Sequence, residues 1–210
     1  MPMPKRPTRR TFLSAGALGV GGLVLAGAEG QAHQLSATWN RPGGLVPAGE
    51  WWAGGGPQLA RSSSEIVSRD EPGQRLIVSG TVYGDDGRTA LPGVTVYVYQ
   101  TDRQGLYNRE GRFGAPHRIK GWANTDELGR YEFITIRPGH YPNRTSPAHI
   151  HMTVCRRDIP EWWLPEIRFQ GDPLLTDADY AAAARDGRFS NVQALVQRDG
   201  HWRCTRDVRL

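Results

Sequence analysis

The residues best suited to chemistry in this chain are two histidines in the segment 147–151, which reads PAHIH. The apolar run around them ends at Val154 and predicts a strand. Because side chains alternate between the faces of an extended strand, His149 and His151 project from one face, at a spacing that suits a metal ion. The alternative is an exposed strand face on which both histidines contact only water. We predict a metal site whose other ligands come from elsewhere.

Two tyrosines lie in turn-rich segments upstream of this strand. Tyr107 follows a Gln-Gly-Leu sequence, and Tyr141 lies between Gly139-His140 and Pro142. Turn residues place both tyrosines on loops, which are free to converge above the strand that carries the histidines. Each tyrosine taken singly is equally well explained as an ordinary amphipathic packing residue. Their spacing alone therefore assigns them no role.

Strand-like segments recur from about residue 75, with Gly and Pro between them. The apolar patterns predict strands at 76–83, 94–99, 129–136, 148–154, 167–169, 192–197 and 201–209. One helix is expected over 177–185, with Thr176 as its N-cap and Gly187 at its end. Short strands at this spacing predict an all-β fold, a β-sandwich of mixed or antiparallel sheets with long loops and one short helix.

The beginning of the chain differs from the strand-rich part. Residues 1–32 hold the pair Arg9-Arg10 followed by an apolar, Gly/Ala-rich stretch, which predicts a cleaved twin-arginine export signal. The alternative is a membrane anchor, but the stretch is shorter than the ~20 residues that span a bilayer. We expect a periplasmic or extracellular protein that meets the membrane only during export. Residues 33–70, rich in Gly, Pro and Ser, are expected to be an irregular arm, with a homo-oligomer contact as one role.

Length and charge limit the remaining part, residues 71–210, to one catalytic or binding domain. The chain has 210 residues and 38% hydrophobic content, enough for one ordinary core. Its net charge of +5 falls to about +2 without residues 1–30, when 22 Lys and Arg stand against 20 Asp and Glu. So small an excess, with no basic run interleaved with aromatics, gives no support to nucleic-acid binding.

Cys155 and Cys204 are the only cysteines of the chain. In a protein exported to an oxidising compartment, we expect them to form a disulfide. The alternative is a pair of separate buried thiols. No CxxC spacing suggests a zinc-binding pair.

Beyond the histidine pair, several specific blocks follow one another along the chain. They are LPGV at 91–94, GLY at 105–107, GRYEFITIRPGHYP at 129–142, PAHIH at 147–151, FQGDPL at 169–174 and DVRL at 207–210. In this order, from about residue 71 to the end, the chain resembles the intradiol ring-cleaving dioxygenases, which include protocatechuate 3,4-dioxygenase and catechol 1,2-dioxygenase. The resemblance implies cleavage of a catechol-type aromatic diol by dioxygen, giving a cis,cis-muconate-type product.

The resemblance also implies a ligand set. Tyr107, Tyr141, His149 and His151 would bind a non-haem iron(III), and Tyr141 would in addition give way to the catechol, which is a catalytic role. The chemistry suits these residues, since an oxidised, hard cation favours anionic oxygen and lowers a phenol's pKa well below its usual ~10. The two imidazoles would complete the site, each oriented by an outer hydrogen bond.

The chain departs from the family pattern near the expected substrate. The family has an arginine three residues before the first ligand histidine, where this chain has Ser146, and a glutamine that aligns with Glu166. Losing such an electrostatic contact costs on the order of 100-fold in rate, so we expect Arg144 or Arg168 to replace it. For each arginine the alternative is a solvated surface position. Ser146 and Glu166 are thus expected to bind substrate, whose identity stays open.

Two other functions compete with the dioxygenase. The first is a noncatalytic, transthyretin-like binding module, suggested by the hairpin at 75–99. The second is a zinc or copper site in which the histidine pair is joined by a carboxylate. The set of two tyrosines and two histidines favours the dioxygenase, because a binding module has no need of it. We assign no role to His117 or His140, since loop histidines are more often exposed to solvent.

Overall fold

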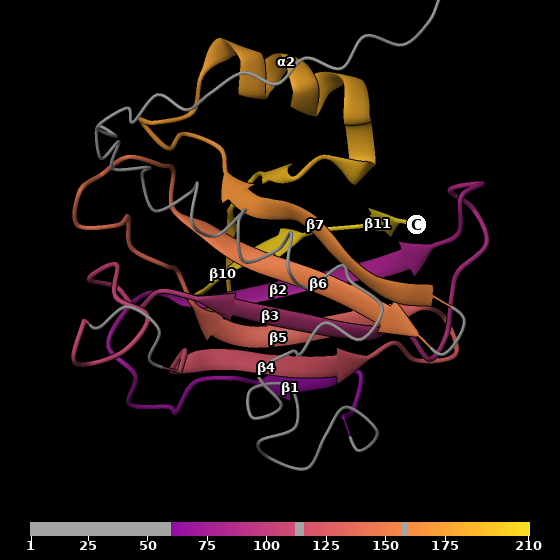
Figure 1. Ribbon diagram of the computed structural model, residues 1–210, viewed down its shortest axis with the longest axis horizontal. Coiled ribbons are helices and arrows are strands. Elements are labelled where there is room, and N and C mark those ends of the chain that lie inside the picture. The colour runs from indigo at the N-terminus through magenta and orange to yellow at the C-terminus, as the bar shows by residue number, and fades with distance from the viewer. Residues whose placement is uncertain (1–59, 112–115, 157–158) are drawn as a thin grey trace, which may run out of the picture.

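A computed structural model of the chain describes residues 60–111, 116–156 and 159–210 (Figure 1). The expected signal at 1–32 and most of the expected arm at 33–70 lie outside the described residues. The strands are β1 (Ser63–Glu65), β2 (Arg75–Tyr83), β3 (Thr95–Gln100), β4 (Ile119–Asn124), β5 (Arg130–Ile136), β6 (His149–Arg156), β7 (Ile159–Phe169), β8 (Val192–Gln193), β9 (Val196–Arg198), β10 (His201–Thr205) and β11 (Val208–Arg209). The one α-helix among the described residues is α2 (Asp177–Asp186). The prediction of an all-β sandwich is confirmed.

The strands form two sheets that pack face to face. The first has the order β1-β5-β2-β10-β9, with β11 also paired to β2, and the second has the order β4-β3-β6-β7-β8. Five of the nine strand pairs among the described residues are antiparallel, and four are parallel: β1 with β5, β10 with β2, β11 with β2 and β7 with β8. The sheets are therefore mixed, one of the two forms expected from the sequence.

The core lies between the inner faces of the two sheets. In β3, Val96 and Val98 point into this core, whereas Tyr97 and Tyr99 belong to a separate aromatic cluster. Each fully buried Val, Leu, Ile or Phe side chain contributes about 1.5–3 kcal/mol through the hydrophobic effect. Because successive residues alternate, the face of β3 opposite the core is the outer face of the second sheet. This outer face carries the site described below.

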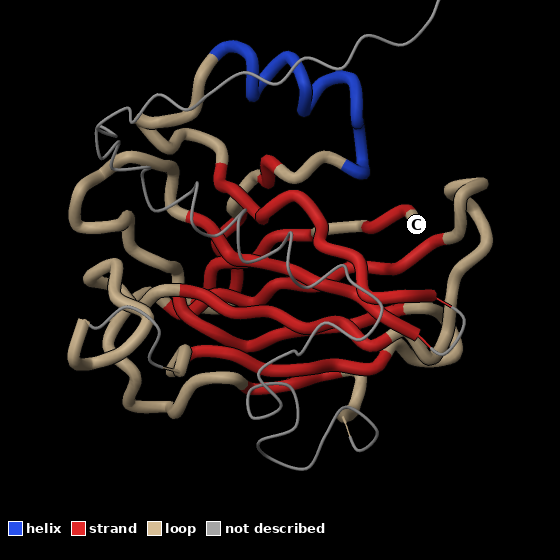
Figure 2. The backbone as a smooth tube through the Cα atoms, viewed as in Figure 1, coloured by secondary structure: helices blue, strands red, loops and turns tan. Residues whose placement is uncertain are grey.

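Helix α2 starts where the sequence predicts. The Thr176 side chain accepts a hydrogen bond from the Asp179 backbone N–H, and the Asp179 carboxylate accepts one from Thr176 N, which completes a capping box. In Figure 2 the helix lies at the margin of the strands, outside the sandwich. It contacts β8 and the following 3-10 turn, and Asp179 forms an ion pair with Arg168 of β7. No helix among the described residues is long and apolar enough to span a membrane.

Several segments differ from expectation. The runs 192–197 and 201–209, each expected as one strand, each form two, β8 with β9 and β10 with β11. The hairpin expected at 75–99 does not form, because β2 and β3 belong to different sheets.

Three further segments differ in where strands form. Residues 63–65, expected within the irregular arm, form β1 and pair with β5. Residues 119–124 form the unpredicted strand β4, whose sequence IKGWAN includes a glycine and a lysine that weaken the apolar alternation. Strand β7 begins at residue 159, well before the expected 167. In each case pairing with neighbouring strands outweighs a weak local pattern.

The expected disulfide is absent, because both cysteines are free. Cys204 lies in the core between the sheets, whereas Cys155 packs against the aromatic cluster of the second sheet. The two thiols therefore lie on opposite sides of that sheet. The sequence alternative of two separate thiols is the correct one.

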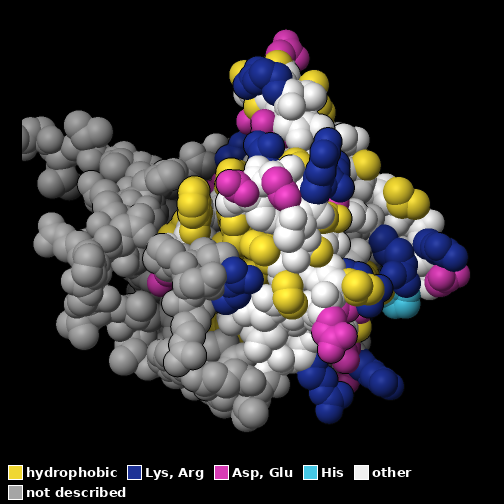
Figure 3. Space-filling model, turned by 90° about the vertical axis from the view of Figure 1, so that its right-hand side faces the viewer, with side chains coloured by type: hydrophobic (Ala, Val, Ile, Leu, Met, Phe, Trp, Pro, Cys, Tyr) yellow, Lys and Arg dark blue, Asp and Glu magenta, His cyan; other side chains and the backbone are white. Residues whose placement is uncertain are grey.

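The surface on the face shown in Figure 3 mixes charges of both signs. Lys and Arg side chains alternate with Asp and Glu side chains, and apolar side chains lie between them. The exposed large apolar residues are Leu128, Trp162, Tyr180 and Val196. They come from four different parts of the chain, so they do not follow one element.

Candidate metal centre

Strand β6 places the two histidines of the PAHIH segment on the outer face of the second sheet. Ile150 and Met152 point into the core and are 1% exposed, whereas His151 lies opposite Tyr99 of β3. The rings of His151 and Tyr99 stack with their centroids 4.3 Å apart. The alternation predicted for this strand thus gives one apolar face and one imidazole face.

The loop that carries Tyr107 is shaped by Asp102, two residues after the end of β3. One oxygen of the buried Asp102 carboxylate accepts hydrogen bonds from the backbone N–H groups of Gln104 and Leu106, at 2.9 and 3.1 Å. Arg118 contacts the other oxygen at 3.4 Å and forms a bidentate pair with Glu71 at 2.6 and 2.8 Å. These contacts satisfy the turn's backbone donors and hold the loop against the sheet.

The loop that carries Tyr141 packs directly on the Tyr107 loop, and two glycines make this contact possible. Gly105 has φ +84°, and a Cβ there would lie 1.8 Å from the carbonyl oxygen of His140. A Cβ on Gly139 would lie 2.5 Å from the carbonyl oxygen of Arg103. The Gly139 N–H also donates to Asp102 O at 2.8 Å. Larger residues at either position would separate the loops and their tyrosines.

The polar ends of the two tyrosines and two histidines meet at one point. Tyr107 Oη lies 2.5 Å from Tyr141 Oη and 2.7 Å from His151 Nε2. Tyr141 Oη lies 3.0 Å from His149 Nε2 and 3.5 Å from His151 Nε2. The two Nε2 atoms are 3.2 Å apart. The structure therefore brings together all four residues that the sequence named as metal ligands.

The tautomer of His149 is set by the backbone. Its Nδ1 lies 2.7 Å from the carbonyl oxygen of Pro147, which can only accept, so Nδ1 carries the proton. The lone pair is then on Nε2, which faces Tyr141 and His151. This is the form in which imidazole binds a metal ion.

The electrostatics favour neutral groups at the cluster. Burial, and then His149, keep the pKa of His151 well below its ordinary value, so its imidazole is neutral and able to act as a ligand. Burial and the adjacent Tyr141 hydroxyl raise the pKa of Tyr107 above that of an ordinary phenol. Ionisation of Tyr107 therefore requires a cation beside its oxygen.

This donor set fits a bound metal ion. Ligand atoms ~2 Å from one ion, at right angles to each other, lie roughly 3 Å apart, and the measured separations of 2.5–3.5 Å bracket that value. Phenol oxygens suit an oxidised, hard cation better than a soft one. Among the described residues no group of three or more His, Cys, Asp or Glu side chains is placed to hold a metal ion. The geometry thus gives no support to the zinc or copper site with a carboxylate.

A buried aspartate, Asp172, links the segments that precede Tyr141 and His149. Asp172 accepts hydrogen bonds from His140 Nε2 at 3.0 Å, from Ala148 N at 3.0 Å and from Leu174 N at 3.0 Å. Burial alone would raise the pKa of Asp172, but these hydrogen bonds outweigh burial and lower it. Since His140 precedes Tyr141 and Ala148 precedes His149, Asp172 fixes the relative position of two donor residues.

Sequence reasoning missed this arrangement. His140 was expected to be exposed and without a role, but it is half-buried and paired with Asp172. The sequence signal was the aspartate of the FQGDPL block, which gave no hint of its partner 32 residues upstream. His117 also lies beside the cluster, with its ring stacked on Tyr99 at 4.2 Å.

The residues expected to contact substrate separate into two groups. Arg168 is the register partner of His149 on β7, and Glu166 lies on the same strand with Oε1 3.9 Å from His151 Nδ1. Arg168 contacts Glu166 at 3.6 Å and Asp179 at 3.1 Å. Both side chains therefore lie beside the histidines.

The other two lie on the loop between Tyr141 and His149. Arg144 is exposed and adopts φ 50° on a turn closed by its N–H to Tyr141 O at 2.8 Å. Ser146 is 2% exposed, and its Oγ has no hydrogen-bond partner among the described residues. Of the two candidate arginines, the structure brings Arg168 to the cluster and leaves Arg144 on the surface.

The chain is similar to proteins of a known family. Residues 53–203 match the family model Dioxygenase_C, described as Dioxygenase. The chain is 32% identical over 161 residues to the protocatechuate 3,4-dioxygenase beta chain of Burkholderia cepacia, covering 70% of this chain and 68% of that one. It is 28% identical over 162 residues to catechol 1,2-dioxygenase 2 of Acinetobacter lwoffii, covering 68% of this chain and 57% of that one. The match thus spans little more than half the length of that catechol 1,2-dioxygenase.

Solved structures share the fold. The dioxygenase domain of a dioxygenase and carbohydrate-binding protein fusion from Streptomyces sp. SirexAA-E aligns with a TM-score of 0.56 and 26% identity, over 72% of this chain and 87% of that one. Catechol 1,2-dioxygenase from Pseudomonas arvilla C-1 aligns with a TM-score of 0.57 and 23% identity, over 72% of this chain and 56% of that one. At that identity the second match is a likeness of fold alone.

Proposed function

The chain belongs to the intradiol dioxygenase family, and from that premise we propose that it uses iron(III) to cleave the ring of a catechol-type diol with dioxygen. The observation that supports this most directly is the convergence of Tyr107, Tyr141, His149 and His151, whose donor atoms each lie within 3.2 Å of at least two of the others. A noncatalytic binding module gives no reason for this convergence. Family membership also favours an enzyme over such a module.

The four residues that would hold the ion differ in how firmly the surrounding backbone holds them. His149 and His151 come from a strand inside the sheet, and Nδ1 of His149 is anchored to Pro147 O. Tyr141 comes from a loop, and the four residues after it are exposed. We propose that Tyr141 is the ligand that yields to the diol, with its Oη taking the proton of one catechol hydroxyl. Iron(III) held by these four residues would withdraw electron density from the diol and so make its ring reactive toward dioxygen.

Charge balance and stoichiometry are consistent with this role. A catechol bound as a dianion would pass one proton to Tyr141 Oη and the other to a hydroxide ion that leaves as water, so the net charge of the buried cluster would not change and a desolvation penalty would be avoided. The bond between the two hydroxyl-bearing carbons breaks, and both atoms of dioxygen enter the product. The product is a cis,cis-muconate-type dicarboxylic acid, and no external reductant is consumed.

We propose that Arg168 supplies the positive charge that Ser146 lacks. The Arg168 Nε atom is buried and has no hydrogen-bond partner among the described residues, while its other nitrogens contact Glu166 and Asp179. A donor thus remains free on the face that carries His149. Glu166, 3.9 Å from His151, would exclude diols with a carboxylate on that side.

The visible spectrum and oxygen uptake of the purified protein test the proposal together. Phenolate-to-iron charge transfer should colour the protein red to burgundy, and catechol should shift the band and start oxygen uptake. Tyr107→Phe should remove most of the colour and reduce turnover by more than 100-fold, since even outer partners of metal ligands are worth 10–100-fold. Tyr83→Phe is the matched control, because Tyr83 packs on Phe189, on a different strand from the cluster. Colour and turnover retained in Tyr107→Phe would contradict the ligand assignment.

We further propose export by the twin-arginine route, which handles folded proteins with cofactors in place. The support is the Arg9-Arg10 pair and the apolar stretch after it. Changing both arginines to lysine should leave uncleaved precursor in the cytoplasm, measured by fractionation and intact mass. Export at the normal rate would refute the proposal.

A further inference from the structure

A cavity of about 580 Å³ is lined in part by His140 and Ala148, the residues that precede the metal-ligand candidates Tyr141 and His149. Its lining residues come from the segment before β2, the loops after β3 and β5, and the start of β6; they are Gly73, Gln74, Arg103, Arg137, Pro138, His140 and Ala148. None of the four donor residues lines it. Its volume lies within the ~300–1,000 Å³ typical of small-molecule sites.

The walls of this cavity are held by backbone contacts. Arg137 N donates to Gln74 O at 2.8 Å, which joins the end of β5 to the start of β2. Gly139 N donates to Asp102 O at 2.8 Å, and the Thr101 hydroxyl donates to Gly139 O at 2.8 Å. These hydrogen bonds fix the backbone that carries the lining side chains.

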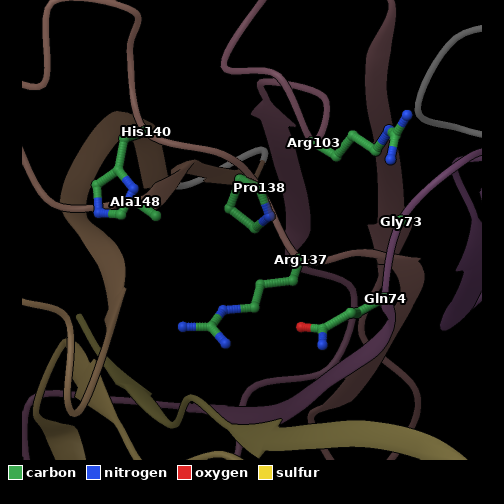
Figure 4. Close-up of a pocket in the computed structure, with 7 residues that line it drawn as sticks. All are labelled: Gly73, Gln74, Arg103, Arg137, Pro138, His140 and Ala148. Carbon is green, nitrogen blue, oxygen red and sulfur yellow. The ribbon is translucent and has the colours of Figure 1, made fainter.

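The cavity carries positive charge that nothing in the described part of the chain neutralises. Figure 4 shows the Arg137 side chain extended into the space below Pro138, with the Gln74 amide beside it and Arg103 at the opposite rim. Neither guanidinium has an ion-pair partner among the described residues.

Two acidic residues that contact the walls of the cavity, Asp172 and Asp102, already have other hydrogen-bond partners. Asp172 accepts from His140, Ala148 N and Leu174 N. Asp102 accepts from two backbone N–H groups and contacts Arg118. The two cavity arginines therefore keep an unpaired charge, and a planar guanidinium next to an amide matches a carboxylate well.

We infer that this cavity binds a small organic carboxylate with an apolar body. Arg137 and Gln74 would hydrogen-bond the carboxylate, Arg103 would attract it at the rim, and the buried Pro138 and Ala148 would contact its apolar part. This site is separate from the iron site and does not depend on the proposed reaction. If that reaction holds, the ring-cleavage diacid belongs to the class of ligand that the cavity selects.

The location gives such a ligand a route to influence the iron site. His140 and Ala148 line the cavity, and each immediately precedes a donor residue, Tyr141 or His149. Asp172 connects both wall residues through hydrogen bonds. A bound carboxylate would contact the backbone that positions two of the four ligands.

Isothermal calorimetry with benzoate on the purified full-length protein tests this inference. We expect saturable binding of one benzoate outside the iron site, tighter than that of acetate or inorganic phosphate. Arg137→Gln should weaken binding by about 10- to 100-fold, the usual worth of a hydrogen bond to a charged group. Arg185→Gln removes the same charge from the exposed last turn of α2 and should leave the affinity unchanged.

The variant Tyr107→Phe separates this site from the iron centre. Benzoate binding that survives Tyr107→Phe but is lost in Arg137→Gln supports the cavity, whether or not the protein turns over catechol. Binding lost in Tyr107→Phe and unchanged in Arg137→Gln would place benzoate at the iron and overturn the inference. Equal weakening by Arg185→Gln, phosphate binding as tight as benzoate, or no benzoate binding would overturn it as well.

Discussion

The two faces of strand β6 perform different tasks with alternating residues. On the inner face, Ile150, Met152 and Val154 are at most 1% exposed and pack in the core between the sheets. On the outer face, His149 and His151 meet Tyr141 and Tyr107. A single strand thus contributes to stability on one side and to ligand geometry on the other.

The difference shows that the two faces tolerate change in different ways. Apolar packing depends on side-chain volume and is shared among many neighbours, so its loss lowers the free energy of unfolding. A polar cluster depends on the position and protonation of a few atoms, so its loss should lower the affinity of the proposed metal site. Substitutions at neighbouring positions of β6 should therefore have separable consequences.

The largest expected effect is that of His149→Ala. Removing a donor atom should reduce iron affinity by more than 100-fold and abolish oxygen uptake with catechol. The unfolding free energy of the iron-free protein should change by less than about 1 kcal/mol, because His149 lies outside the core. Iron content by mass spectrometry and urea unfolding measure the two quantities. A large loss of stability with iron retained would reverse the assignment of the faces.

The adjacent substitution Ile150→Ala should do the opposite. Truncating this buried side chain should lower the unfolding free energy by about 2–5 kcal/mol. Iron bound per folded molecule should stay at the level of the unmodified protein, since His149 and His151 keep their partners. Denaturant unfolding and iron content of the folded fraction provide the comparison with His149→Ala. Loss of iron without loss of stability would show that the faces are not independent.

A smaller effect is expected for Asp172→Asn, which touches no donor atom. The amide keeps the shape but cannot accept from His140, Ala148 N and Leu174 N as a carboxylate does. Iron affinity or turnover should fall by about 10- to 100-fold, the usual cost of losing an outer partner. Asp126→Asn is a matched control, because Asp126 accepts from Leu128 N and Arg130 N in the turn that connects β4 to β5. An equal loss of iron in both variants would contradict a positioning role.

The smallest effect concerns the two thiols. Burial raises the pKa of Cys204 to about 12, so its thiol should stay protonated and unreactive toward iodoacetamide at about pH 8. The folded pKa exceeds the ~8.5 of an unfolded cysteine, so this group's contribution to stability should fall as pH rises above that value. Cys155, half-buried on the other face, should react first. Both thiols should react when the protein is unfolded without reductant. An intact protein mass lower by two hydrogens would instead reveal a disulfide.

Much of the fold could be predicted because its signals are local. The capping box at Thr176 and the alternation in β2, β3, β5 and β6 depend on residues a few positions apart. Strand β4 could not be predicted from the sequence, because a glycine and a lysine interrupt its apolar pattern and the strand is held by pairing with β3. The same holds for β1, three residues that form a strand only beside β5.

The candidate site was predictable only in its residues, not in its arrangement. The resemblance named the four ligands, but nothing local shows that Gly105 and Gly139 let the two tyrosine loops touch. Nor does spacing reveal that Asp172 pairs with His140, because that contact joins two loops distant in the chain. Arg144 and Arg168 were equal candidates in the sequence, and only the register of β6 and β7 brings Arg168 opposite His149.

The sequence by itself determined the all-β class, the one helix and the common face of His149 and His151, because a period of two residues is a property of any extended strand. The tertiary structure alone decided that four donor atoms converge and that the cysteines lie on opposite sides of a sheet. It also decided that two arginines without an ion-pair partner among the described residues line a cavity beside His140 and Ala148. Those outcomes depend on close contacts between loops and on strand register. Both are set by packing over distances that no local pattern records.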